Sequence, residues 1–144
     1  MRRRNRSPIE IRRLSYVIMV LASMAGGWAG ATEGPVAMIA VLVLSVAATA
    51  CYVRAADLLL DFDYRRTRRQ AVLFAIVGMA AALVGCVVAS QVTNGSRSEL
   101  VRALGYAAIG GGIAVGLSGL VALLWSFAGT YAGEQIEKRS NEEW

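Results

Sequence analysis

The charged residues divide the chain into four long apolar segments. None of these segments contains Asp, Glu, Lys or Arg, and they are Leu14–Thr32, Gly34–Val53, Gln70–Ser96 and Ala103–Gly133. About 20 residues of α-helix are enough to cross the hydrocarbon core of a bilayer, which is roughly 30 Å thick. Each segment is long enough for one crossing and too short for two. We therefore predict helices near residues 9–31, 35–60, 67–92 and 97–133.

Local signals agree with helix ends at these places. Ser7-Pro8-Ile9-Glu10 has the form of a capping box, in which a serine and a glutamate three residues later satisfy the first backbone amides of a helix. Thr32-Glu33-Gly34-Pro35 is a cluster of helix breakers that leaves room only for a tight turn. The sequence thus predicts an all-α fold, an integral membrane four-helix bundle made of two antiparallel transmembrane hairpins. It forms a single domain over 1–144, with tails at 1–8 and 134–144.

The arginine distribution predicts an orientation. Of the 15 basic residues, only Arg97 and Arg102 fall on one side of the predicted spans, and the others fall on the opposite side. The positive-inside rule places the arginine-rich side, with both termini, in the cytoplasm. A cleavable signal ending at Ala31 is the alternative, but cleavage there would leave a chain beginning just before the second span. We expect an intact, multi-pass protein of a cell membrane, and the dominance of arginine over lysine favours a prokaryotic host.

The composition limits the kinds of chemistry that we expect this chain to carry out. The chain is 56% hydrophobic, has a net charge of +5 and contains no histidine, so the commonest general base and zinc ligand is missing. The predicted span interiors hold no ionisable groups besides Cys51, Cys86 and tyrosines, which argues against proton-coupled transport and voltage sensing. We expect no enzymatic activity, no cofactor, no metal and no nucleic-acid partner. The two cysteines should lie too far apart along the bilayer normal for a disulfide.

Small residues recur at helical spacing. Gly26 and Gly30 are four apart in the first segment, and Gly112 and Gly116 are four apart in the last. Such pairs let helix backbones approach closely. We interpret these four glycines as a helix-packing interface, either inside this bundle or between subunits through the fourth helix. Gly110-Gly111-Gly112 could unwind that helix, but we expect it to remain continuous.

The central cytoplasmic segment is rich in charge. Arg65, Arg66, Arg68 and Arg69 are candidate contacts for anionic lipid headgroups, although fixing the topology is a sufficient reason for them. The three aspartates at positions 57, 61 and 63 do not have the spacing of an EF-hand loop, and we expect ion pairing instead, including Arg54 with Asp57.

These features lead to one main functional hypothesis. It is a small non-catalytic membrane protein, an accessory, assembly or stabilising subunit whose partners are the lipid bilayer and other membrane subunits. The alternative is a homo-oligomeric channel or facilitator for a small uncharged or apolar solute, which would require several copies because four helices enclose little space. A third hypothesis is a regulatory protein whose arginine-rich face senses lipid or a signalling partner.

Overall fold

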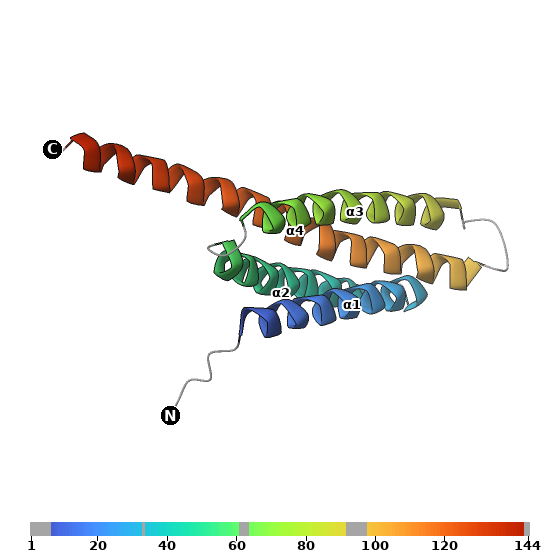
Figure 1. Ribbon diagram of the computed structural model, residues 1–144. Coiled ribbons are helices and arrows are strands. Elements are labelled where there is room, and N and C mark those ends of the chain that lie inside the picture. Colours follow the sequence, from blue (N-terminus) through green and yellow to red (C-terminus); the bar gives the residue numbers. More distant parts are fainter. Residues whose placement is uncertain (1–6, 33, 61–63, 92–97, 143–144) are drawn as a thin grey trace, which may run out of the picture.

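The computed structural model describes residues 7–32, 34–60, 64–91 and 98–142, and these residues form four helices and no strand. They are α1 (Pro8–Thr32), α2 (Pro35–Leu60), α3 (Tyr64–Gln91) and α4 (Ser98–Glu142) (Figure 1). All four are long and apolar enough to cross a membrane. The prediction of an all-α chain with four potential membrane-spanning helices is confirmed.

Two helix ends differ from the predicted ones by three residues or more. Helix α3 begins at Tyr64, three residues earlier than expected, and α4 continues to Glu142, through most of the segment predicted as a tail. The segment after residue 133 contains no proline, and Glu134 and Lys138 have the spacing of a favourable helical ion pair. Charge ends a membrane span but does not end a helix, so the apolar window underestimated the length of α4. Most of the tail at 1–8, and Asp61 and Asp63, lie outside the described residues.

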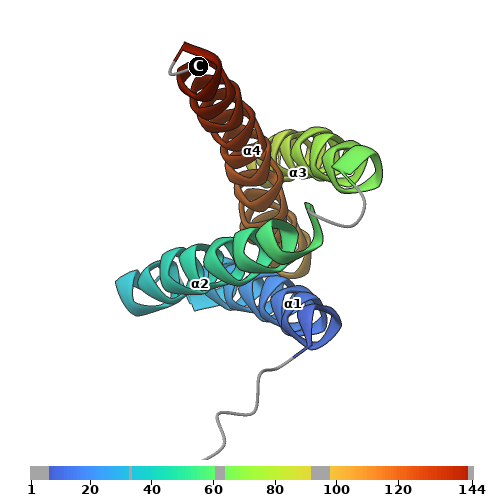
Figure 2. The same cartoon turned by 60° about the vertical axis from the view of Figure 1, so that its left-hand side comes forward.

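Helix α4 occupies the centre of the molecule. Helix α3 packs along one side of it, while α1 and α2 lie together on the other side (Figure 2). Contact between α2 and α3 is slight, and the ring of Phe74 provides much of it. This ring stacks on Tyr52 with centroids 5.2 Å apart and meets Tyr16 of α1 at 5.9 Å. The other three helices therefore form an open arrangement around α4.

Hydrogen bonds at the helix ends follow the local sequence. The Ser7 amide donates to Glu10 Oε2 at 3.3 Å, and the Glu10 amide donates to Ser7 Oγ at 3.4 Å, so the predicted capping box is confirmed. At the far end of α1, Arg102 Nε donates to the Gly30 carbonyl oxygen at 2.9 Å. One of the otherwise unpaired carbonyls at the end of α1 thus gains a charged donor from α4.

The core between the helices is made mostly of small side chains. Ala22, Ala48 and Ala114 are completely buried, with Met19 and Tyr52 as the largest members of the cluster. Large apolar side chains point outwards instead, for example Leu42 on α2 and Leu83 on α3. Small residues inside and large ones outside are typical of helices that pack in lipid, where association depends on close backbone approach.

Candidate functional site

Helix α1 lies against α4 through its glycines. A Cβ atom on Gly26 would collide with the Tyr106 carbonyl oxygen and stand 3.2 Å from Gly110 Cα. A Cβ atom on Gly30 would stand 2.8 Å from Tyr106 Cβ. Both positions leave no room for a larger side chain, so these two predicted packing residues lie between α1 and α4.

The other predicted packing residues lie between α4 and α3. A Cβ on Gly112 would stand 2.7 Å from the Gly78 carbonyl oxygen and 2.6 Å from the Ala82 amide nitrogen. One on Gly116 would contact the Gly78 carbonyl carbon at 3.4 Å. Since α3 of the same chain covers this stripe, Gly112 and Gly116 are occupied by a contact within the chain, and a seam between subunits would have to use other residues.

The three consecutive glycines of α4 serve two neighbouring helices at once. Gly110 faces Ala22 of α1 and Gly111 lies beside Ser23, while Gly112 faces α3. The Ser23 hydroxyl donates to the Ala107 carbonyl oxygen at 2.9 Å, which adds a polar contact between α1 and α4. Helix α4 remains α-helical throughout this stretch, as expected. Close packing on both sides explains why three glycines are placed together here.

A groove of about 550 Å³ runs between α2 and α4. Its walls are mainly apolar and it is open along one side. The lining residues from α2 are Val46, Thr49, Ala50, Val53, Arg54 and Asp57, and those from α4 are Leu117, Val121 and Trp125. The apolar residues line most of its length, and the charged residues are gathered at one end. We call this feature the α2–α4 groove.

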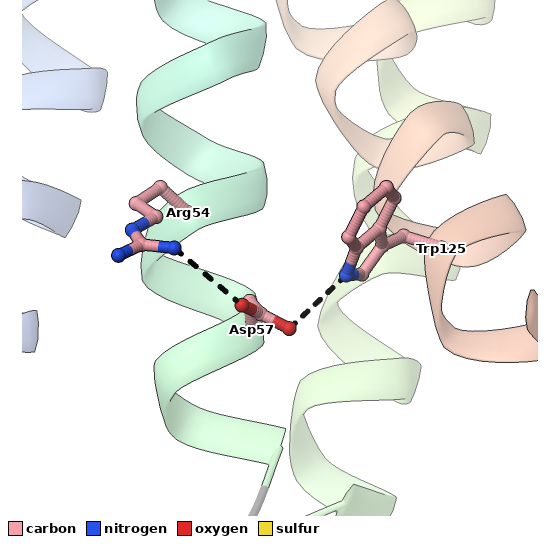
Figure 3. Close-up of polar contacts among 3 residues, drawn as sticks. All are labelled: Arg54, Asp57 and Trp125. Carbon is pink, nitrogen blue, oxygen red and sulfur yellow. Dashed lines mark hydrogen bonds and ion pairs between the residues drawn. The ribbon is translucent and has the colours of Figure 1, made fainter. Parts of the chain in front are cut away.

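Three side chains form the polar end of the groove. Arg54 Nη1 lies 3.9 Å from Asp57 Oδ2, and Trp125 Nε1 donates to Asp57 Oδ1 at 3.0 Å (Figure 3). The predicted pairing of Arg54 with Asp57 is confirmed. The Arg54 and Asp57 side chains are 70% and 43% exposed, so both keep capacity for a ligand. Sequence reasoning gave Trp125 no place in a site, because its contact joins residues 68 positions apart.

Hydroxyl groups lie beside the apolar part of the groove. Thr49 Oγ1 and Ser118 Oγ are 3.4 Å apart, and each is also bonded to a carbonyl of its own helix. Ser45 Oγ is buried and has no hydrogen-bond partner among the described residues. Thr49 and Ser118 thus link α2 to α4.

The predicted lipid-contacting arginines lie at the beginning of α3 and are all exposed. Arg65, Arg66 and Arg69 share the first turns of the helix with Arg68, whose guanidinium carbon lies 4.8 Å from the centre of the Phe127 ring of α4. This cation–π contact gives Arg68 a role in joining α3 to α4. Arg68 is therefore exposed and also contacts α4.

Metal and sulfur chemistry find little support in the described part of the chain. There, no three His, Cys, Asp or Glu side chains come together in a group that could hold a metal ion. Cys51 and Cys86 are both free thiols, one half-buried and the other exposed.

Comparisons with protein families, with curated proteins and with solved structures find no match for this chain.

Proposed function

We propose that this chain is a non-catalytic accessory subunit of the cell membrane, which assembles with or stabilises another membrane component. The observation that supports this function is the length of α4. The uncharged part of α4 ends at Gly133, but the helix continues to Glu142. In Figures 1 and 2 this continuation projects beyond the other three helices.

The projecting segment has the properties of a binding element. Nine residues follow Gly133 within α4, which corresponds to about 14 Å of helix at 1.5 Å per residue. A helix of this length is marginally stable in water when it packs against nothing. Continuity with α4 supports it on one side, and a partner would stabilise it further. A partner bound there would be held at a fixed distance from the membrane surface.

The proposed membrane placement follows the charge distribution. The chain forms two antiparallel transmembrane hairpins, and the arginine-rich ends, both termini and the projecting part of α4 lie in the cytoplasm of a prokaryotic host. The partner of the projecting segment is then a cytoplasmic domain or a loop of a larger membrane protein.

The internal packing supports this function over transport by a single chain. Gly26, Gly78 and Gly112 bring α1 and α3 so close to α4 that a single added carbon would collide with backbone atoms. A polar passage along these contacts is not compatible with such spacing. The alternative of a channel requires a pathway between several copies of the chain.

The test is native mass spectrometry of the full chain, tagged at its N-terminus and extracted gently from its own host membrane. A variant that ends at Gly133 is the matched comparison, since it keeps all four uncharged segments. We expect the full chain to carry a larger partner in fixed ratio and the shortened chain to lose it while inserting equally well.

Two results would overturn the accessory function. One is a pure homo-oligomer of the full chain, which would favour the channel and lead to flux assays in liposomes. The other is a partner retained in full by the shortened chain, which would show that the projecting part of α4 does not bind it.

A further inference from the structure

The α2–α4 groove matches one leaflet of a bilayer in length. Its lining residues on α2 extend from Val46 to Asp57, which is about 16 Å at 1.5 Å per residue. Half of a hydrocarbon core of roughly 30 Å is about 15 Å. The charged end lies just beyond Val53, the last residue of the uncharged segment of α2, and the opposite end, at Val46, lies inside that segment. An acyl chain anchored at the charged end would fill the groove along its length.

The charges at the groove's end match a headgroup that carries both signs. Arg54 offers donors to a phosphate, and Asp57 offers an acceptor to an ammonium group within 3.9 Å of that guanidinium. An anionic lipid would satisfy only Arg54 and would be repelled by Asp57. A primary ammonium group also donates hydrogen bonds, which a quaternary choline cannot do, and the Trp125 ring adds an aromatic surface for the cation.

We propose that the α2–α4 groove binds one phospholipid with an amine headgroup, of the phosphatidylethanolamine type. The phosphate contacts Arg54, the ammonium contacts Asp57 beside Trp125, and one acyl chain lies on the apolar walls. This proposal rests on the membrane placement given above and not on the accessory role.

A protein helix fits the groove less well than a lipid chain. Tight helix pairs in membranes need small residues on the facing surfaces. The apolar walls here carry Val46, Val53, Leu117 and Val121, which are branched and keep a partner backbone at a distance. A smaller groove of about 230 Å³ between α1, α3 and α4 has no charged lining residue, so we expect no headgroup preference there.

The test uses the purified full chain and native mass spectrometry of bound lipid. The protein is offered phosphatidylethanolamine, phosphatidylcholine and phosphatidylglycerol with identical acyl chains in equal amounts. We expect one retained lipid, with a preference of about fivefold for the ethanolamine lipid over each of the other two, since one charged contact at a membrane surface contributes about 1 kcal/mol.

Two substitutions test the contributions of Arg54 and Asp57 separately. D57N keeps an oxygen acceptor for Trp125, so the fold should be preserved, but the preference for ethanolamine over choline should fall to about one. R54Q should weaken the binding of the ethanolamine lipid and of the choline lipid alike, because both carry a phosphate. R13Q is the matched control, since Arg13 is an exposed arginine of α1 that does not line the groove. It should bind lipid as the unchanged protein does.

A groove-filling variant tests the position of the acyl chain. Ala50 lines the groove and is exposed, so A50W should block the lipid while leaving the helix contacts intact. Circular dichroism and thermal unfolding check that each variant is folded. Equal binding of the three lipids, a preference that survives D57N, or lipid binding unaffected by A50W would each overturn the proposal. The proposal would also be overturned if a polypeptide, in place of a lipid, were found cross-linked inside the groove. The accessory role is measured separately, through the partner held by α4.

Discussion

Single glycines set the distance between the helices. At Gly78, an added Cβ would collide with the backbone of Gly116 and stand 2.7 Å from the Gly112 carbonyl oxygen. At Gly27, an added Cβ would meet Ala103 and Ala107 at 3.5 Å, which is ordinary van der Waals contact. Two glycines that look alike in the sequence thus differ in the space around them.

This difference predicts opposite responses to the same substitution. We expect Gly78→Ala to lower the free energy of unfolding by about 1–3 kcal/mol, because α3 must move away from α4. Gly27→Ala should leave it unchanged or raise it by up to about 1 kcal/mol, since alanine favours the helix. Reversible unfolding in detergent measures both variants. Equal destabilisation of the two proteins would contradict the close approach of α3 to α4.

At the scale of the helices, the Phe74 side chain links α3 to both α1 and α2. The Phe74 ring meets both Tyr16 and Tyr52, and aromatic pairs contribute about 0.5–1.5 kcal/mol each beyond the area they bury. We expect Phe74→Ala to cost about 2 kcal/mol or more of unfolding free energy. Leu73→Ala is the control, because Leu73 is 51% exposed on the same helix and should cost little. A similar loss of unfolding free energy in both variants would contradict the role of Phe74 in joining α3 to α1 and α2.

The existence of the helices could be predicted from the sequence, because a charged side chain is costly inside a bilayer and its absence marks a span. The central position of α4 among the helices could not. In a water-soluble protein, apolar residues mark the buried face, but lipid is as apolar as a protein core. Leu42 faces outwards and Leu44 packs against the core, although their side chains are identical. Small residues marked the contact positions without indicating their partners.

The candidate site was predictable only in part, for a similar reason. Arg54 and Asp57 are three positions apart on one helix, so helical geometry alone brings them together. The contact of Asp57 with Trp125 requires α2 to lie beside α4, and no local pattern carries that information. The groove itself forms where α2 lies beside α4, and no local pattern in the sequence predicted it.

At the scale of the whole molecule, the arginine distribution and the fold lead to a testable orientation. Ser7 precedes α1 and Gln91 ends α3, and both residues are exposed. The proposed topology places Ser7 in the cytoplasm, since it belongs to the arginine-rich side, and places Gln91 on the outer side. Two residues of one chain therefore report on opposite surfaces of the membrane.

The measurement uses single cysteines introduced by Ser7→Cys or Gln91→Cys, in a protein whose Cys51 and Cys86 are replaced by serine. A membrane-impermeant maleimide should label the Gln91→Cys protein in intact cells and the Ser7→Cys protein only after the membrane is opened. The reverse pattern would place the arginines outside, against the positive-inside rule, and would move the projecting part of α4 away from any cytoplasmic partner. Labelling of both proteins in intact cells would place Ser7 and Gln91 on the same side of the membrane, against the three crossings that α1, α2 and α3 are proposed to make between them. The accessory function and the orientation are therefore tested together, because a cytoplasmic partner can reach α4 only if this labelling pattern is found.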